Sequence, residues 1–261
     1  MSKTVVITGA SGGIGHALSL EYARPGTKLI LCDLNAEQLN NTASMCKKTA
    51  DQVDTFSFDL SKADAVSIAA EKILSACDII DRLILVGGVS QRGSALKTSL
   101  ETDRKIMEIN YFGHINLTKT LLPAMLKSED PHIGVTSSIS GRFGFHLRSA
   151  YAASKFALHG FFESLRLEHH KDKLKVSIIC PGRINTPISL SAITESGEKH
   201  GKMDPGQNNG MPAETCARKM KKAIEKGKKD VLIGKQEILM VYFRKYLPFI
   251  FYKLANKINP R

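Results

Sequence analysis

Several features that mark secreted, disordered or zinc-binding proteins are missing from this chain. Its five cysteines are scattered and odd in number, and none forms a C-x-x-C pair. Such usage fits reduced thiols better than a disulfide framework or a zinc site. No long low-complexity tract occurs, so disorder is a poor account. The start, Met-Ser-Lys-Thr, runs straight into an apolar segment without a signal-peptide hydrophobic region. We therefore expect an intracellular, cytoplasmic protein that binds no metal.

The apolar content is sufficient for one sizeable core. With 261 residues, 43% of them hydrophobic, residues 1–261 are expected to form a single domain. The net charge of +12 is unevenly placed, because residues 199–261 hold 15 Lys or Arg against 5 Asp or Glu. A basic face can attract nucleic acid, anionic lipid or an acidic carrier, or can simply be a solvated helix. Without a zinc-finger or RNA-binding aromatic motif, we expect no nucleic-acid partner.

Short apolar runs rich in β-branched residues alternate with segments of helical periodicity. This alternation predicts an α/β fold, a Rossmann-type doubly wound parallel sheet with helices on both faces. The expected strands are 5–7, 29–31, 83–86, 133–135, 176–179 and 231–233, and the expected helices include 106–126, 152–167 and 214–224.

The pattern changes in two places near the C-terminus. Residues 187–212 are rich in Ser, Gly, Asn and Pro, which predicts a mobile loop of the kind that often covers an active site. Residues 237–261 form an apolar, aromatic extension interspersed with Arg and Lys, and Pro248 is expected to break it into two short helices.

A glycine-rich stretch, Thr8 to Gly15, follows the first expected strand and opens a helix. Glycine allows the backbone to turn tightly and to approach a pyrophosphate, and the helix N-terminus offers free N–H groups to the anion. Alone, the stretch is weak evidence, with a tight strand-to-helix turn as the alternative, but its place at the first junction of an α/β pattern predicts nucleotide binding. The residues expected to contact the cofactor here are Gly9, Ser11, Gly13, Ile14 and Gly15.

Two aspartates extend this candidate site. Asp33 ends the second strand, where its carboxylate would accept hydrogen bonds from the adenosine ribose and repel a 2′-phosphate. This favours NAD over NADP, as does Ser11 in place of a basic residue. The alternative for Asp33 is a cap on the next helix. Asp59 is expected near the adenine amino group, with a helix cap as its alternative.

Tyr151 and Lys155 stand four residues apart and therefore on one face of a helix. A lysine cation about 4 Å from the phenol would favour the phenolate by roughly 4 kcal/mol, or about three pKa units, with burial opposing it. A tyrosine tuned in this way can act as a general acid–base. Thirteen residues upstream, Ser138 follows a buried strand and can bind the reacting oxygen. Ser137 and Ser140 are competitors for that role.

Taken together, these motifs resemble the short-chain dehydrogenase/reductase (SDR) family over residues 3–235. Thr8 to Gly15 matches T-G-x-x-x-G-x-G, and Tyr151 to Lys155 matches Y-x-x-x-K. Asn110 to Gly113 matches N-x-x-G, and Pro181 to Thr186 matches P-G-x-[VI]-x-T. The resemblance implies an oxidoreductase that moves a hydride between NAD(H) and an alcohol or carbonyl carbon.

The resemblance also implies roles for individual residues. The Asn110 carbonyl would hold a water that links Lys155 to solvent, and Lys155 would bind the nicotinamide ribose. Thr186 and the Ile184 backbone, within a turn that includes Pro181 and Gly182, would hold the carboxamide. The chain departs from the family's N-N-A-G with Leu85-Val86-Gly87-Gly88, and the departure puts cofactor affinity in doubt more than reaction class. Cofactor contacts are still expected at Gly87 and Gly88.

The substrate is expected to lie against the segment between Ser138 and Tyr151. Phe143, Phe145 and His146 would line this side, with core packing of the phenylalanines as the alternative. They suggest a hydrophobic carbonyl or secondary alcohol such as a steroid, retinoid or fatty-chain compound. By analogy with the family, a homodimer or homotetramer is expected.

The extension over 237–261 has three interpretations: a pocket cover, a subunit contact or a peripheral membrane contact. Cations interrupt it too often for a transmembrane span. Two functions of other classes also stay open, a catalytically silent NAD(H)-binding regulator and a membrane-associated scaffold.

Overall fold

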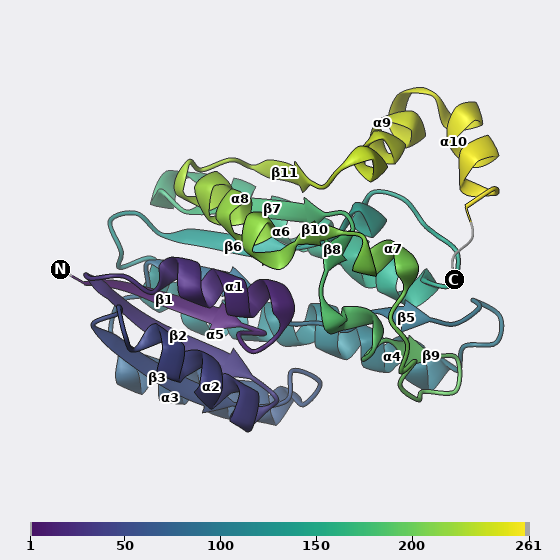
Figure 1. Ribbon diagram of the computed structural model, residues 1–261. Coiled ribbons are helices and arrows are strands. Elements are labelled where there is room, and N and C mark those ends of the chain that lie inside the picture. The colour runs from purple at the N-terminus through teal and green to yellow at the C-terminus, as the bar shows by residue number, and fades with distance from the viewer. Residues whose placement is uncertain (1, 259–261) are drawn as a thin grey trace.

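The computed structural model describes residues 2–258, and a seven-stranded sheet lies at its centre (Figure 1). The strand order is β11-β7-β6-β4-β1-β2-β3, and every neighbouring pair is parallel. The strands are β1 (Lys3–Thr8), β2 (Thr27–Asp33), β3 (Gln52–Ser57), β4 (Arg82–Leu85), β6 (His132–Thr136), β7 (Lys175–Pro181) and β11 (Asp230–Ile233).

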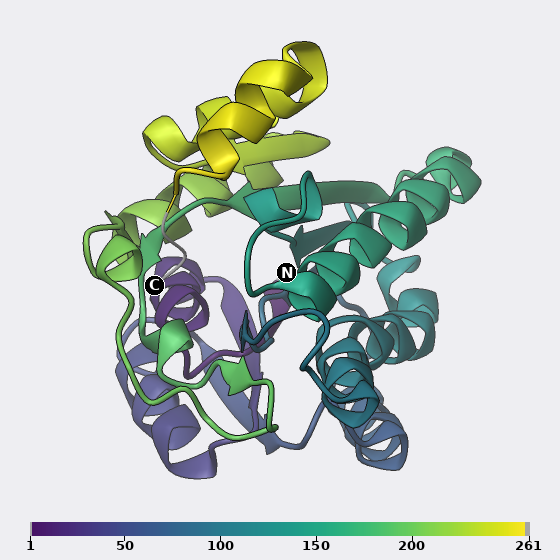
Figure 2. The ribbon, with the colours of Figure 1, turned by 90° about the vertical axis from the view of Figure 1, so that its right-hand side faces the viewer.

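Helices cover both faces of the sheet, so the predicted doubly wound fold is confirmed (Figure 2). One face packs against α1 (Gly13–Tyr22), α2 (Ala36–Cys46) and α8 (Ala213–Glu225). The other packs against α3 (Ala63–Ala76), α5 (Gly113–Met125) and α6 (Ser149–Glu168), with α4 (Leu100–Met107) beside α6.

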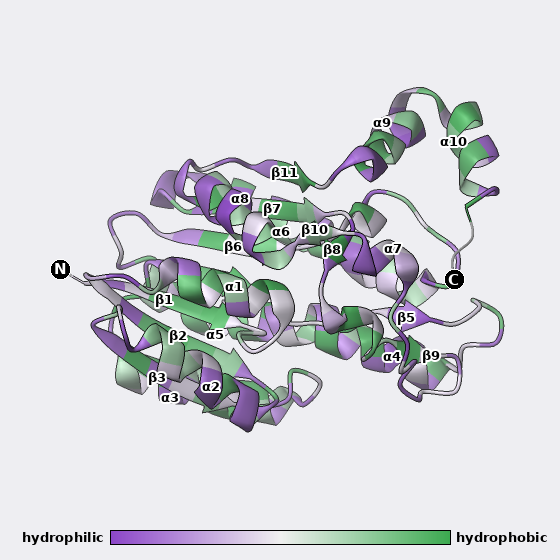
Figure 3. Ribbon diagram, in the orientation of Figure 1, coloured by the Kyte–Doolittle hydropathy of each residue, from purple (hydrophilic) through white to green (hydrophobic). Residues whose placement is uncertain are grey.

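The continuous apolar runs exist because the central strands are covered on both sides. Side chains alternate across a strand, so Val5 and Ile7 enter the core under α1 and α8, whereas Val6 enters the core under α3 and α5. All three are at most 1% exposed. The hydropathy colouring shows the same apolar strands between more polar helix surfaces (Figure 3).

Two expectations about the elements need correction. The edge strand β3 was not among the predicted strands, because it is partly exposed and lacks a continuous apolar run. The helix expected over 106–126 starts at Leu100, where Ser99 accepts a hydrogen bond from the Thr102 amide. It also changes to a π-helical turn, η1 (Glu108–Phe112), before α5.

The order of the strands places the site. From β1 the chain runs outward to β2 and β3, then crosses back to β4 on the other side of β1. At such a switch point the loops after neighbouring strands turn in opposite directions and leave a crevice at their carboxyl ends. The predicted cofactor loops after β1, β2 and β4 all open into this crevice.

The segment 187–212 folds over the carboxyl edge of the sheet as a series of short elements. These are η4 (Pro187–Ser189), β9 (Ile193–Thr194), α7 (Pro205–Asn208) and β10 (Met211–Pro212). Two of them pair with short strands of the body, β9 with β5 (Gln91–Arg92) and β10 with β8 (Ile184–Asn185). The segment is therefore held at both ends.

The C-terminal extension forms η5 (Gln236–Ile238), α9 (Leu239–Tyr246) and α10 (Pro248–Ala255) and stands away from the sheet (Figure 1, yellow). Pro248 occupies the first turn of α10, so the predicted break into two short helices is confirmed. Residues 259–261 of the predicted extension lie outside the described residues. Within residues 2–258, no helix is long and apolar enough to cross a membrane.

Candidate active site

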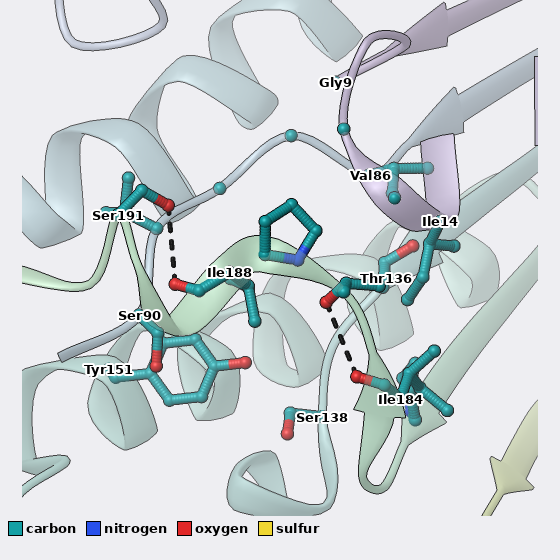
Figure 4. Close-up of a pocket in the computed structure, with 18 of the residues that line it drawn as sticks. Gly9, Ile14, Val86, Ser90, Thr136, Ser138, Tyr151, Ile184, Ile188 and Ser191 are labelled. Atoms are coloured by element: carbon teal, nitrogen blue, oxygen red, sulfur yellow. Dashed lines mark hydrogen bonds between the residues drawn. The ribbon is translucent and has the colours of Figure 1, made fainter. Parts of the chain in front are cut away.

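A cavity of about 1120 Å³ opens at the carboxyl edge of the sheet, and nearly all the predicted site residues line it (Figure 4). Its size suits a dinucleotide together with a substrate. Asn110 and His146 are the two predicted residues that do not line it. Those that do are Gly9, Ser11, Gly13, Ile14, Gly15, Asp33, Asp59, Gly87, Gly88, Ser138, Phe143, Phe145, Tyr151, Lys155, Pro181, Gly182, Ile184 and Thr186.

The glycines after β1 are required by close backbone approach. Gly9 has φ +65°, and a Cβ there would lie 2.6 Å from the Gly87 nitrogen. A Cβ on Gly15 would lie 1.9 Å from the Gly9 carbonyl oxygen, and one on Gly13 would lie 2.4 Å from Thr186. No acidic side chain stands in the first turn of α1 to compete for its N–H groups. This cradle fits a pyrophosphate.

The two aspartates sit beside this cradle. Asp33 accepts hydrogen bonds from the Ser11 and Asn35 amides at 3.0 and 3.2 Å, while Asn35 itself caps α2. A carboxylate accepts several hydrogen bonds, so Asp33 can still bind a ribose hydroxyl. Asp59 accepts from the amide and hydroxyl of Ser61, and α3 starts only at Ala63. The helix-cap alternative for Asp59 is therefore wrong.

Ser138, Tyr151 and Lys155 meet on one wall of the cavity. Ser138 follows β6 as the N-cap of η2 (Ile139–Gly141), and Figure 4 shows its hydroxyl and that of Tyr151 projecting into the same space. Tyr151 and Lys155 share one face of α6. The Lys155 Nζ donates to the Thr136 carbonyl at 2.9 Å and lies 5.8 Å from the centre of the Tyr151 ring.

Burial sets the protonation of this group. It raises the pKa of Tyr151, and a hydrogen bond with the Ser138 side chain opposes the rise. Burial also lowers the pKa of Lys155 to about 8. The expected fall in the pKa of Tyr151 is therefore not met: its desolvation outweighs the nearby charges, and Lys155 is itself partly neutral near pH 8.

Ser137 does not compete with Ser138 for the reacting oxygen. Its hydroxyl donates to the Lys155 carbonyl at 3.1 Å and lies 3.0 Å from His159 Nε2, with the Cys180 thiol at 3.6 Å from the same nitrogen. Burial lowers the pKa of His159 to about 4, so this imidazole is neutral. The resulting buried network fixes the turn of α6 that carries Lys155.

Asn110 lies behind the cavity wall and is fully buried. Its side-chain amide bonds both main-chain groups of Val89 at 2.9 Å and donates to Ser154 Oγ at 3.0 Å. These contacts fix the loop after β4 against α6. The role of its carbonyl in a proton relay stays a prediction.

The unusual segment Leu85-Val86-Gly87-Gly88 is absorbed by the fold. Leu85 is buried in the core, and Thr8 Oγ1 accepts hydrogen bonds from the amides of Val86 and Gly87. His114, whose importance the sequence did not reveal, lies 2.7 Å from the Gly87 carbonyl through Nε2. Burial lowers the pKa of His114 to about 4, so a neutral imidazole holds this loop.

The turn after β7 is tied to two residues that the sequence patterns did not single out. Gln207 of α7 donates to Ile184 O and, at 3.4 Å, to Thr186 Oγ1, the groups expected to hold a carboxamide. Glu237 of η5 accepts from the Arg183 amide at 2.9 Å and closes over Gly182. The loop 187–212 and the C-terminal extension thus both contact this turn.

Phe143 serves core packing and the cavity at once. It is 4% exposed, and its ring lies 5.1 Å from that of Phe251 in α10, in an edge-to-face arrangement. Phe145 packs on the same cluster. His146 is exposed, with its ring 5.5 Å from that of Phe145, so the structure does not place it at the substrate.

A charged group on the substrate side was also missed. Arg92, Arg148 and Arg183 line the cavity together with Asp204. Single arginines in loops carry no sequence pattern, and Asp204 is 112 residues from Arg92 in the chain. Fold and site together define a dinucleotide-binding α/β protein with a serine–tyrosine–lysine centre.

Comparisons with known proteins agree with this class. The family model described as short chain dehydrogenase matches residues 3–196. Dehydrogenase/reductase SDR family member 7B of Bos taurus is 39% identical, over 97% of this chain and 80% of that protein. Dehydrogenase/reductase SDR family protein 7-like of Drosophila melanogaster is 32% identical, over 98% of this chain and 80% of that protein. The chain belongs to the short-chain dehydrogenase/reductase family, a family of oxidoreductases.

Solved structures show the same fold. A short-chain dehydrogenase/reductase from Burkholderia phymatum in complex with NAD has a TM-score of 0.83 at 23% identity, covering 100% of this chain and 98% of its own. A short-chain dehydrogenase from Shigella flexneri complexed with NADP has a TM-score of 0.75 at 28% identity, covering 88% and 96%. These neighbours include complexes with either nicotinamide cofactor.

Proposed function

We propose that this protein transfers a hydride between NAD(H) and the carbon of a secondary alcohol or ketone in a largely hydrophobic substrate. The observation that carries the proposal is the convergence of Ser138, Tyr151 and Lys155 on one wall of the cavity, next to the glycine cradle. When bound, the nicotinamide supplies or accepts the hydride.

The protein's own residues would hold and move the proton. Ser138 donates a hydrogen bond to the reacting oxygen and so fixes its position beside Tyr151. Tyr151 gives its phenolic proton to that oxygen during reduction and removes it during oxidation. Lys155, held by the Thr136 carbonyl, is mostly cationic near pH 7 because its pKa is about 8, and it would bind the cofactor ribose. The high pKa of Tyr151 favours the protonated form that reduction requires.

The residues around the cradle fit a dinucleotide. Gly9, Gly13 and Gly15 leave the space that a Cβ would fill, and the N-terminus of α1 faces it. Asp33 at the end of β2 supports NAD in preference to NADP, because its charge repels a 2′-phosphate.

The substrate side supports a hydrophobic compound. Phe143, Phe145, Ile188 and Leu190 line it, and Met240 of α9 closes it from the extension. This contact supports the interpretation of the extension as a pocket cover. Exposed aromatic residues on α9 and α10, with Tyr246 at 64% and Phe249 at 70%, support a subunit or peripheral membrane contact for the outer face.

The test is an activity screen of hydrophobic ketones and secondary alcohols with NADH, NADPH and their oxidised forms. We expect turnover that Tyr151→Phe reduces by about 10²- to 10⁴-fold, with NADH binding retained. Turnover that survives this change would refute the proposed centre. Tight NADH binding without turnover of any substrate would favour the silent regulator. Liposome sedimentation with and without residues 237–261 tests the scaffold.

A further inference from the structure

The substrate half of the cavity carries more positive than negative charge. Asp204 Oδ2 accepts from Arg92 Nε at 2.8 Å and lies 3.3 Å from Arg148 Nη2. The side chains of Arg92 and Arg148 are 5% and 16% exposed, and that of Asp204 is 12% exposed. Arg183 lines the same cavity. Two guanidinium groups, those of Arg92 and Arg148, thus share one largely buried carboxylate, which His200 Nε2 also approaches at 3.5 Å, while Arg183 lies exposed at the cavity rim.

Arg92 and Arg148 differ in how completely they are satisfied. Arg92 also donates to Ser90 Oγ at 2.7 Å and to the Gln91 carbonyl at 2.6 Å, so its pairing with Asp204 ties loop 187–212 to the body. Within residues 2–258, Arg148 donates only to the His146 carbonyl, at 3.2 Å, and to Asp204. A guanidinium has five N–H donors, which leaves Arg148 with donors to offer.

The environment of Arg148 is unfavourable to its charge. Burial and the neighbouring Arg92 lower the pKa of Arg148 to about 10. A buried cation of this kind is stabilised when an anion completes its hydrogen bonds, and a guanidinium fits a carboxylate or phosphate through two parallel bonds. An anion that accepts the remaining N–H donors would therefore stabilise the charged form of Arg148.

Arg148 also stands close to the reacting group. It is the N-cap of α6 and precedes Tyr151 by three residues, both side chains line the cavity, and the charge of Arg148 acts to lower the pKa of the Tyr151 phenol. Its guanidinium lies 5.6 Å from the centre of the Phe145 ring, which orients it along the cavity wall. An anion on Arg148 would therefore lie in the same cavity as a carbonyl held at Tyr151.

We propose that Arg148, backed by the Arg92–Asp204 pair, binds an oxyanion of the substrate, a carboxylate or a phosphate group near the reactive carbonyl. This inference rests on the proposed function and adds a polar end to the hydrophobic substrate. It predicts that the protein discriminates between ketones of equal size by the charge that they carry.

The test compares matched ketones with NADH: oxohexanoates with the ketone at different positions against their methyl esters, and an α-hydroxyketone phosphate against the free α-hydroxyketone. The variants are Arg148→Gln and Arg148→Lys. Arg218→Gln, at an exposed position on α8, is the control for the loss of one positive charge outside the cavity. We expect Arg148→Gln to raise KM for the favoured anionic substrate by about 10- to 100-fold. Its neutral partner should change by no more than about twofold.

Arg148→Lys keeps the charge and should recover part of the affinity, and Arg218→Gln should behave as wild type. A preference for the carboxylates or for the phosphate identifies the source of the oxyanion. Equal kcat/KM for charged and neutral partners in the wild type would overturn the proposal.

A binding measurement separates this inference from the proposed function. The same acids and esters are titrated by calorimetry into protein saturated with NAD⁺, which covers the glycine cradle and cannot reduce the ketones. Binding of an acid that Arg148→Gln weakens, without turnover of any ketone, would sink the proposed function and leave the oxyanion site standing. Acid binding that is equal in wild type and Arg148→Gln would remove the oxyanion site.

Discussion

The cofactor half of the cavity is formed mainly by backbone, whereas the substrate half is formed mainly by side chains. The cofactor half consists mainly of backbone, because the loops after β1 and β4 touch at Gly9 and Gly87 with no room for a Cβ. The substrate half consists of side chains brought from distant segments, such as Phe143 against Phe251 and Arg92 against Asp204. The first half is fixed by steric exclusion, whereas the second depends on packing and charge. The two should therefore respond to different mutations.

The largest effect is expected from filling the cradle. Gly15→Ala places a Cβ 1.9 Å from the Gly9 carbonyl oxygen, so the backbone must move. We expect NADH affinity to fall by about 5- to 150-fold, since overpacking against main chain typically costs about 1–3 kcal/mol. Calorimetry or NADH fluorescence measures it. Gly160→Ala in α6 is the control, because nothing lies within 4 Å of its Cβ. Unchanged affinity in Gly15→Ala would contradict the cradle.

The next effect tests the substrate half. Phe251→Ala removes a ring that is 3% exposed and packs on Phe143. We expect the free energy of unfolding to fall by about 3 kcal/mol, with NADH affinity changed by no more than about twofold. Denaturant unfolding and NADH titration measure the two quantities. Phe249→Ala, on the same helix but 70% exposed, should leave both unchanged. A large loss of NADH affinity in Phe251→Ala would mean that the two halves are coupled.

A pH experiment probes the histidine beneath the cofactor half. The pKa of His114 is lowered from 6.5 to about 4, so only the unfolded chain takes up a proton as pH falls through this window. The stability that the neutral His114 contributes is fully present above pH 6.5 and is lost as the pH falls toward 4. The loss reaches about 2 kcal/mol by pH 5. His114→Gln should therefore lose about 2 kcal/mol less stability between pH 8 and pH 5 than wild type. Parallel pH dependences in denaturant unfolding would show that His114 is not the group responsible.

The smallest effect concerns the choice of cofactor. Asp33→Ser removes the carboxylate that faces the expected 2′-position but keeps a hydroxyl for hydrogen bonding. We expect the ratio of kcat/KM for NADPH to that for NADH to rise about tenfold, which corresponds to the loss of one screened like-charge contact. Glu37→Ser, an exposed acid in the first turn of α2, is the control. A strong NADPH preference in the wild type would refute the role given to Asp33.

The contrast between the halves also explains what could be read from the sequence. The cofactor half follows from local rules, because Gly9 to Gly15 and the strand ends at Asp33 lie within one strand–helix–strand unit. The apolar strands were visible for the same reason, since a strand covered on both faces must be apolar throughout. The edge strand β3 was not, because it is half exposed.

The substrate half was harder to predict because its contacts join distant residues. Arg92 and Asp204 are 112 positions apart, and no periodicity connects them. The burial of each side chain also could not be predicted from the sequence. The spacing correctly predicts that Tyr151 and Lys155 share one face of a helix. It does not predict the raised pKa of Tyr151, because desolvation depends on the folded surroundings and not on the spacing.

The π-helical turn η1 constrains the number of residues between α4 and α5. Its hydrogen bond from the Gly113 amide to the Glu108 carbonyl spans one residue more than an α-helical bond. Deleting a residue here would restore a regular helix but rotate Asn110 by about 100° about the axis relative to α5, away from Val89 and Ser154. Point substitutions at the exposed Phe112 should thus be tolerated, whereas single-residue deletions between Glu108 and Phe112 should not. In this turn, the number of residues and the identity of Asn110 are therefore constrained, whereas the exposed residues are free to vary.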